Sequence, residues 1–199
     1  SLSLSLSLSL SLSLSLLSPI LYLIFVNDAT DNLDRNLISP SQFADDIGVW
    51  SSSKSVQEAM NLIQNGVWQL EKWCKKWHVQ LNPLKSQLVV FTKCPRHKIE
   101  IDQLKPTIKL FNHDIPIVTE ATYLGVIFDA RLTWEPQFCK MTARAYKRLN
   151  IIRHLSSLSK KPNPNTLIHL YRSIIRPIIE YGSVCIINAA EVHLNKIQL

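Results

Sequence analysis

Leucine and serine alternate strictly at the start of the chain, and this pattern ends near Ser18. Residues 1–16 are eight Ser-Leu pairs. Alternation has the period of a strand, but a perfect dipeptide repeat is first of all low-complexity sequence and is weak evidence for a strand. The DNA repeat TCTCTC encodes Ser-Leu-Ser-Leu, so a microsatellite would produce this segment directly. We therefore interpret residues 1–14 as a non-native or disordered segment.

A secretory signal peptide is the alternative interpretation of the repeat. No Lys or Arg precedes Arg35, so the basic region that opens a signal peptide is missing. Serine interrupts the apolar run at every second position, which also argues against a transmembrane helix. We therefore expect an intracellular protein, cytoplasmic or nuclear, that is not secreted and has no membrane partner.

Beyond the repeat, the apolar positions first predict a helix, a hairpin and a long helix. Ser18 and Pro19 begin the run 20–26, whose faces are all apolar, so we expect a buried helix. Apolar residues on both sides of a polar turn predict a hairpin over 37–53. An apolar stripe at three- and four-residue spacing then predicts a helix over 56–77 with Ser55 as its cap.

Further along, short apolar runs precede a region with helical periodicity. A loop is predicted over 92–106, where two prolines stand among mixed charges. The order of elements predicts an α+β fold, an antiparallel sheet with packed helices followed by a mostly α-helical region. The predicted strands span 79–81, 88–91 and 123–128, a hairpin spans 108–117, and the helices span 136–155 and 164–176.

Charge favours an anionic partner. The 199 residues carry a formal net charge of +7, and no Asp or Glu occurs from 137 to 179. Lys140, Arg144, Lys147 and Arg148 recur at three- or four-residue spacing on one helical face, where like charges repel unless an anion lies opposite. We interpret these four and Arg153 as nucleic-acid-binding residues, with a solvated basic face as the alternative. The four cysteines are too widely spaced for a zinc module or a disulfide scaffold.

The adjacent carboxylates of Asp45 and Asp46 are the sharpest chemical feature. At a tight turn they project into one small volume, where repulsion disfavours double ionisation without a divalent cation. Such a pair suits Mg²⁺ and phosphoryl transfer by two metal ions. An ordinary solvated turn is the alternative, because turns are rich in Asp. Lys85, between two predicted strands, is placed to stabilise a leaving pyrophosphate, or is a plain surface lysine.

Five motifs in order resemble the reverse transcriptase of jockey-type non-LTR (LINE-type) retrotransposons, over about residues 15–190. Each motif is weak or moderate alone, and their order and spacing make the resemblance strong. The motifs are Leu17-Ser-Pro-Ile-Leu-Tyr-Leu-Ile-Phe-Val-Asn-Asp28, Phe43-Ala-Asp-Asp46, Trp73 and Trp77 with Leu81-Asn-x-x-Lys85-Ser, Tyr123-Leu-Gly-Val-x-Phe-Asp129 with Leu132-Thr-Trp134, and Tyr171-Arg-Ser-x-Ile-Arg-Pro-Ile-Ile-Glu-Tyr-Gly182.

The resemblance implies a role for each matching segment. Residues 15–134 would form part of a polymerase palm, and 135–199 a basic helical thumb or connection. Two Mg²⁺ ions, an RNA template, a DNA primer and a dNTP are the implied cofactor and partners, with no small-molecule cofactor. The implied site residues are Asp45 and Asp46 as catalytic metal ligands, Lys85 near the nucleotide phosphates, and Tyr123, Leu124 and Gly125 as the primer grip.

Two departures from the family pattern limit this expectation. Ser13 and Leu14 stand where the family has Gln and Gly, so the match dissolves inside the Ser-Leu repeat. The fingers and the palm strand with the third catalytic aspartate are not found upstream. We therefore expect a reverse transcriptase fragment without measurable polymerase activity as this chain. The alternative is a non-enzymatic nucleic-acid-binding remnant.

Overall fold

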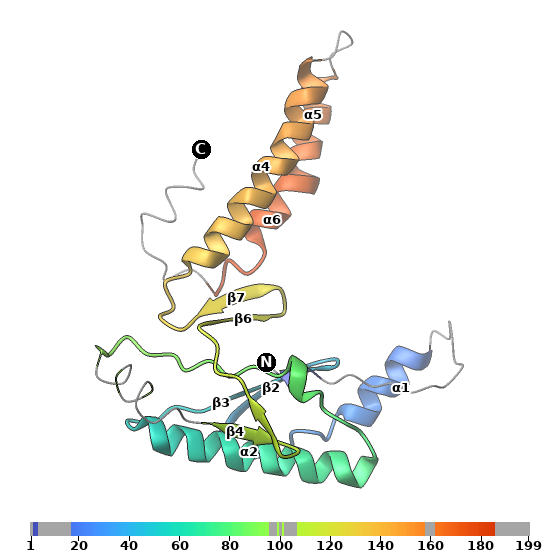
Figure 1. The fold of residues 1–199 in the computed structure, drawn as a ribbon. Helices are drawn as coiled ribbons and strands as arrows, with labels where there is room; N and C mark the ends of the chain where they lie inside the picture. The colour runs from blue at the N-terminus through green and yellow to red at the C-terminus, as the bar shows by residue number, and fades with distance from the viewer. Residues whose placement is uncertain are drawn as a thin grey trace. The chain divides into compact units, whose positions relative to one another are not determined.

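A computed structural model describes residues 2–3, 17–95, 99, 101, 107–157 and 162–185 (Figure 1). The chain forms two compact units, unit 1 from Ser1 to Gly125 and unit 2 from Val126 to Leu199. The sequence analysis places its functional boundary further along, between 134 and 135. Each unit is described by itself below.

Unit 1 combines helices with short antiparallel strands, the α+β composition that the sequence predicts. Its main sheet has the strand order β1-β3-β2, and β3 pairs antiparallel with both neighbours. The other strands form the hairpin β4–β5 and the strand β6. The elements are β1 (Leu2–Ser3), α1 (Leu17–Val26), β2 (Ser39–Phe43), β3 (Asp46–Trp50), α2 (Val56–Trp77), the 3-10 helix η1 (Pro83–Lys85), β4 (Ile108–Leu110), β5 (His113–Ile115) and β6 (Glu120–Tyr123).

The Ser-Leu repeat contributes only β1 to the described structure. Leu2 pairs with Ile47 and Ser3 with Asp46. Residues 4–16 lie outside the described residues, so the interpretation of 1–14 as non-native or disordered stays a prediction.

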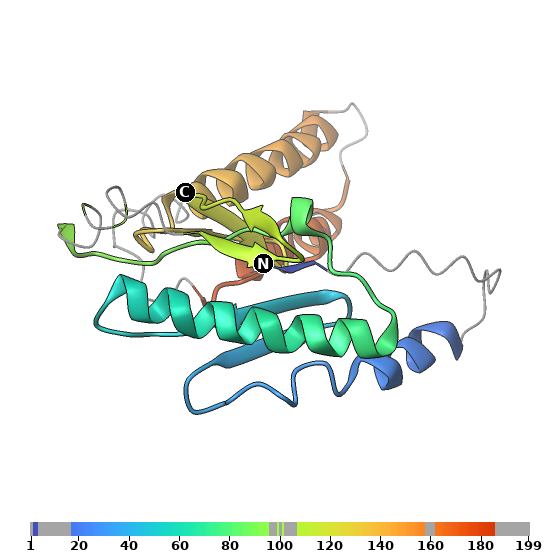
Figure 2. The same cartoon turned by 60° about the horizontal axis from the view of Figure 1, so that its bottom comes forward.

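Helix α2 covers one face of β2 and β3 and supplies more buried residues to the core of unit 1 than any other element (Figure 2). Its predicted apolar stripe is confirmed, since Val67, Leu70 and Cys74 are fully buried in one cluster with Ile47 of β3. The helix begins after Ser55, as predicted, but the Ser55 side chain makes no capping hydrogen bond. The sheet therefore gains its hydrophobic cover from a pattern that was readable in the sequence.

Two polar side chains of α2 satisfy the backbone of β4 and the turn after it. The Gln64 side chain accepts a hydrogen bond from Lys109 N–H at 2.8 Å and donates one to the Lys109 carbonyl at 3.0 Å. A Glu71 carboxylate oxygen accepts from Phe111 N–H at 2.8 Å. Because the two side chains lie seven residues apart, they share one face of the helix. The two side chains thus supply hydrogen bonds that a neighbouring strand would otherwise make to this edge of the β4–β5 hairpin.

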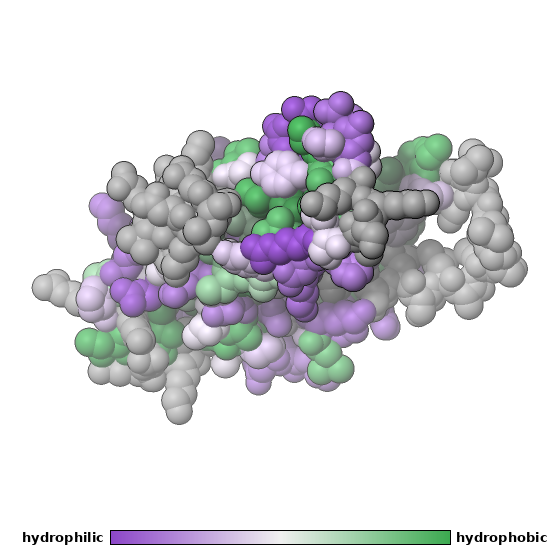
Figure 3. Space-filling view, turned by 90° about the horizontal axis from the view of Figure 1, so that it is seen from above, coloured by the Kyte–Doolittle hydropathy of each residue, from purple (hydrophilic) through white to green (hydrophobic). Residues whose placement is uncertain are grey.

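Helix α1 lies where the sequence predicts a helix, but the prediction that this helix is buried is wrong. Val26 is buried, whereas Ile20, Leu21, Leu23 and Ile24 are between 52% and 67% exposed. An apolar composition cannot bury a helix unless other elements cover it. Hydrophobic residues also interrupt the hydrophilic surface elsewhere (Figure 3). Among the described residues no helix has the length and apolar character needed to span a membrane.

Several predicted strands are wrong in detail. Residues 79–81 are not a strand, and of 88–91 only Leu88 forms an isolated bridge, to Ile117. The predicted strand 123–128 is two strands, because Leu124 and Gly125 both have positive φ, 47° and 80°, as in a type I′ turn. The hairpin 108–117 is confirmed with a tighter turn. Parts of the predicted loop 92–106 lie outside the described residues.

Unit 2 consists of a strand and helices that pack along one another. Helix α4 contacts η2 and α6, and the two predicted helices are confirmed, the second with a π-helical turn in its middle. The buried cluster is small and consists of Val126, Trp134, Phe138 and Met141. The elements are β7 (Val126–Asp129), α4 (Glu135–Ser157), α5 (Pro164–Leu170), the π-helix η2 (Tyr171–Ile175) and α6 (Arg176–Glu180).

The segment that joins β7 to α4 is organised by one buried carboxylate. Asp129 accepts hydrogen bonds from the Thr133 N–H, the Thr133 hydroxyl and the Trp134 N–H, at 2.8 to 3.0 Å. Leu132 and Trp134 both have positive φ, a conformation that L residues rarely adopt. The hydrogen bonds to Asp129 hold this strained segment and start α4.

Candidate functional site

The two adjacent carboxylates lie at the tip of the β2–β3 hairpin. Phe43 pairs with Asp46, so Ala44 and Asp45 form a two-residue turn. Ala44 has φ of 51°, and a positive φ at the first turn position alone is typical of type II′ turns, where glycine is preferred. Asp45 is therefore exposed in the turn itself, whereas Asp46 is the half-buried first residue of β3.

Strand alternation places Asp46 on the face opposite the core. Ile47 is buried toward α2, so Asp46 and Gly48 face the other way. Ser41, which pairs with Gly48, lies on the same face as Asp46. Phe43, which pairs with Asp46, lies on this face too, and Trp50 is at its far end.

Tyr123, a predicted primer-grip residue, lies on this carboxylate face. Its hydroxyl is 3.1 Å from Ser41 Oγ and donates to the Ser41 carbonyl at 3.3 Å. Its ring lies edge-on to the Trp50 ring, with centroids 6.2 Å apart. A Cβ at Gly48 would stand 3.4 Å from the Tyr123 ring, at van der Waals distance, so the ring lies directly against this strand. The structure thus brings two sequence-predicted segments together, the hairpin and the start of Tyr123-Leu124-Gly125.

Tyr22 of α1 is a residue of this site that the sequence analysis missed. Its hydroxyl is buried and has no hydrogen-bond partner among the described residues. Desolvation by burial raises the pKa of Tyr22, and the negative charge of Asp45 raises it further. The Gln42 side chain ties the hairpin to the end of α1 by donating to the Val26 carbonyl at 2.9 Å. A tyrosine in an apolar run gives no signal that its hydroxyl will be buried within the electrostatic reach of a carboxylate.

Lys85 stands apart from the carboxylates in the described contacts. It ends η1, and its side chain is exposed. The turn is fixed locally, because the Asn82 side chain accepts from Leu84 N–H and the buried Ser86 hydroxyl donates to the Asn82 carbonyl. The hydrogen bonds and ion pairs of the described part of the chain do not join Lys85 to either aspartate. Its predicted role at the nucleotide phosphates stays a prediction.

The predicted nucleic-acid-binding residues all lie on α4. Arg144, Lys147 and Arg148 are exposed, and Lys140 is half-buried. Helical geometry places these four on one side of α4, as the spacing predicts. Arg153 is exposed on another side of α4, two turns C-terminal to Tyr146. Its guanidinium donates a long hydrogen bond to the Asn150 side chain at 3.4 Å. The basic side of α4 therefore consists of four residues, with Arg153 outside it.

The carboxylate hairpin meets part of what Mg²⁺ requires. Mg²⁺ is commonly held by one or two carboxylates together with substrate phosphates, which Asp45 and Asp46 fit. A site for two metal ions needs further ligands. No cluster of three or more His, Cys, Asp or Glu side chains able to hold a metal ion occurs among the described residues. The donor set of this hairpin thus fits one ion and is incomplete for two.

Comparisons with known proteins point to one family. A family model described as reverse transcriptase (RNA-dependent DNA polymerase) matches residues 15–128. The chain is 30% identical over 189 residues to a probable RNA-directed DNA polymerase from transposon X-element, and 29% identical over 192 residues to that from transposon BS, both of Drosophila melanogaster. It is 28% identical over 193 residues to the RNA-directed DNA polymerase from mobile element jockey of Drosophila funebris.

These matches are to one part of much longer proteins. Each alignment covers 92% of this chain but only 20% of the relative. The chain therefore spans about a fifth of the length of the curated relatives it matches. No solved structure matches it.

Proposed function

Because the chain belongs to the reverse transcriptase family, we propose that it forms part of the palm and thumb of an RNA-directed DNA polymerase of a non-LTR retrotransposon. The observation that carries the proposal is the carboxylate hairpin with Tyr123 on its Asp46 face. Two sequence segments that are more than seventy residues apart meet there, which is what a shared site requires. In this proposal residues 15–134 belong to the palm.

Asp45 and Asp46 are the residues that would hold Mg²⁺. The ion would supply charge neutralisation at the nucleotide phosphates and activation of a primer 3′-hydroxyl. Support comes from the two adjacent carboxylates at the tip of an antiparallel hairpin in which every residue of β2 pairs with one of β3. Since the described residues offer two carboxylates and no third ligand, we propose that this chain alone does not catalyse polymerisation.

The remaining residues would bind the partners of such a polymerase, an RNA template, a DNA primer and a dNTP. Tyr123, Leu124 and Gly125 would position the primer end near the carboxylates, and Lys85 would contact the nucleotide phosphates. The basic side of α4 would follow the phosphate backbone of the template–primer duplex, as the exposed Arg144, Lys147 and Arg148 favour.

A chimera tests the proposal most directly. The matching fifth of the X-element polymerase is replaced by residues 15–185 of this chain, and primer extension on an RNA template is measured. We expect incorporation by the chimera and its loss in Asp45→Asn and Asp46→Asn. Asp114→Asn, on the exposed side of β5, is the control. A soluble, folded chimera in which Asp45→Asn keeps full activity contradicts the role of the hairpin.

The chain by itself provides a second test. We expect no primer extension by the purified chain at any Mg²⁺ concentration. Incorporation that disappears in Asp45→Ala would show that the two carboxylates suffice and that the proposed inactivity is wrong.

A non-enzymatic nucleic-acid-binding protein is the second candidate, favoured by the basic side of α4, which lies in a different unit from the carboxylates. The two candidates differ in one measurement. Binding of an RNA–DNA hybrid that is unchanged by Asp45→Asn and by Mg²⁺, together with an inactive chimera, favours the second.

A further inference from the structure

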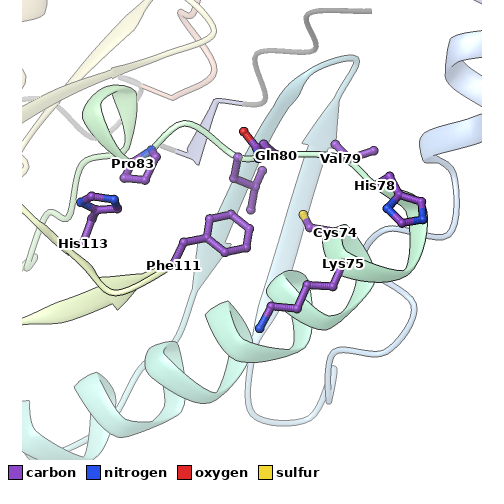
Figure 4. Close-up of a pocket in the computed structure, with 9 residues that line it drawn as sticks. Cys74, Lys75, His78, Val79, Gln80, Pro83, Phe111 and His113 are labelled. Atoms are coloured by element: carbon purple, nitrogen blue, oxygen red, sulfur yellow. The ribbon is translucent and has the colours of Figure 1, made fainter.

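A cavity of about 560 Å³ lies between the C-terminal end of α2 and the β4–β5 hairpin (Figure 4). All of its lining residues belong to unit 1. Neither Asp45 nor Asp46 lines it. The cavity is therefore separate from the carboxylate hairpin, and its volume is in the range of small-molecule sites.

The floor of the cavity is apolar. Val79 and Leu81 follow α2 and are buried, although the sequence analysis took them for a strand. Burial and the nearby Glu71 charge raise the pKa of the Cys74 thiol to about 11. Cys74 is thus a protonated, apolar part of the floor near neutral pH. Pro83 of η1 completes this side, so the cavity borders the segment that carries Lys85.

Among the described residues that line the cavity, the rim carries basic and polar groups and no carboxylate. Lys75, His78 and His113 line it, with the two imidazoles at opposite ends of the view in Figure 4. The amide of Gln80 is a further polar group at the rim. Glu71 is the nearest acid on α2, but its carboxylate accepts the hydrogen bond from Phe111 N–H. A ligand with a negative charge thus meets hydrogen-bond donors and no carboxylate among the described lining residues.

An aromatic ring stands between the two imidazoles. Phe111 projects from the turn between β4 and β5, and its ring is part of the cavity wall (Figure 4). Phe111 and Asn112 have φ of 48° and 65°, a type I′ turn, in which Asn and Gly are preferred. A bulky residue at the first position of this turn costs stability, so the turn itself does not require the ring. The partly buried Phe111 ring does pack against the core.

We propose that this cavity binds a nucleoside 5′-phosphate, either free or as one nucleotide of a single strand. The base stacks on Phe111, and the phosphate is held by Lys75 and His78, which lie three residues apart at the C-terminal end of α2. Aromatic side chains bind bases of any sequence by stacking, and cationic groups bind phosphate. An apolar floor, a ring and a rim of donors suit this ligand, whereas a purely apolar ligand would leave the donors unused. The site does not depend on the proposed polymerase reaction.

The experiment is calorimetric titration of the full chain with dAMP, with inorganic phosphate, and with the oligonucleotide (dA)₆. We expect saturable binding of dAMP that is at least tenfold tighter than that of phosphate. Phe111→Asn removes the ring and suits the turn, so it should weaken dAMP binding by about tenfold, since one stacked base contributes that much or more. Circular dichroism and urea denaturation check that the variant is folded.

Two charge variants give a matched comparison. Lys75→Gln should weaken dAMP binding, whereas Lys54→Gln, an exposed lysine before α2 that does not line the cavity, should not. If Phe111→Asn fails to fold, His78→Gln takes its place, because His78 is exposed at the end of α2. Its expected effect is likewise about tenfold, that of one lost charge-assisted hydrogen bond.

The three ligands distinguish the outcomes. In either supporting outcome, Phe111→Asn weakens the binding of dAMP and of (dA)₆ equally. If dAMP is the tighter ligand, the site binds a free nucleotide. If (dA)₆ is the tighter ligand, the site binds one nucleotide of a strand. Phosphate that binds as tightly as dAMP overturns the proposal in favour of a simple anion site. Absence of saturable dAMP binding, or binding that Phe111→Asn, His78→Gln and Lys75→Gln all leave unchanged, overturns it entirely.

Discussion

The Tyr123 hydroxyl lies 3.1 Å from Ser41 Oγ and joins β6 to the strand that leads into the carboxylate turn. The two residues are 82 positions apart, so this contact exists only in the folded chain. Of the three predicted primer-grip residues, this contact fixes only Tyr123. Tyr123 is held on the hairpin, whereas Leu124 and Gly125 form the turn that follows.

Tyr123→Phe should lower the free energy of unfolding of the chain by about 1 kcal/mol, the usual contribution of one partly buried hydrogen bond. Tyr123→Ala should cost more, because the ring contacts with Trp50 and Gly48 are lost too. Urea denaturation measures both. Tyr146→Phe on the exposed side of α4 is the control, and an equal effect there would show that the Ser41 contact is not the cause.

Ala44→Gly should stabilise the β2–β3 hairpin by roughly 0.5 kcal/mol. Relief of the positive φ gains about 1 kcal/mol or more, and the greater freedom of glycine in the unfolded chain offsets part of it. Ala143→Gly, at an exposed position in the middle of α4, should instead destabilise that helix by about 1 kcal/mol. Urea midpoints compare the two. A destabilised Ala44→Gly would mean that the turn conformation is not strained.

Asp129 should make the stability of unit 2 depend on pH. Burial alone would raise its pKa, but the hydrogen bonds from Thr133 and Trp134 outweigh burial and lower it. The pKa in the folded chain is thus below that of the unfolded chain, about 4. The stabilisation is fully present above the unfolded value and is lost as the pH falls through the folded one.

Asp129→Asn removes this charge and one acceptor for the backbone N–H groups. The variant should be less stable than the parent chain at pH 7, by about 2 kcal/mol. The difference should shrink as the pH is lowered from 5 to 3. Urea denaturation at several pH values measures it, with Asp114→Asn as the control. A difference that stays constant over this range would refute the assignment.

Arg144→Glu with Lys147→Glu should weaken binding of an RNA–DNA hybrid and reduce its salt dependence. Each lost phosphate contact lowers the slope of log affinity against log salt by roughly 0.9. Arg153→Glu should have a smaller effect, because Arg153 lies outside the basic side of α4. Fluorescence anisotropy across a salt series measures this. Equal effects of the three substitutions would show that α4 has no single binding side.

Periodicity within the chain was enough to predict the long helices. The apolar stripe of α2 and the acid-free basic stretch of α4 repeat every three or four residues, and a helix places such residues on one side whatever surrounds it. The carboxylate hairpin was also predictable, since apolar residues flank a polar pair. Motif order then pointed to the family that the comparisons identify.

What the sequence alone determined was therefore local, the helices, the hairpin and the family. Only the tertiary structure decided which surfaces are covered and which distant residues meet. Helix α1 is exposed although its faces are apolar, because burial depends on what other segments supply. Tyr22 of α1 interacts with Asp45, and Tyr123 of β6 contacts Ser41 on the face of the hairpin that carries Asp46. Contacts between such distant segments leave no periodic signal in the sequence.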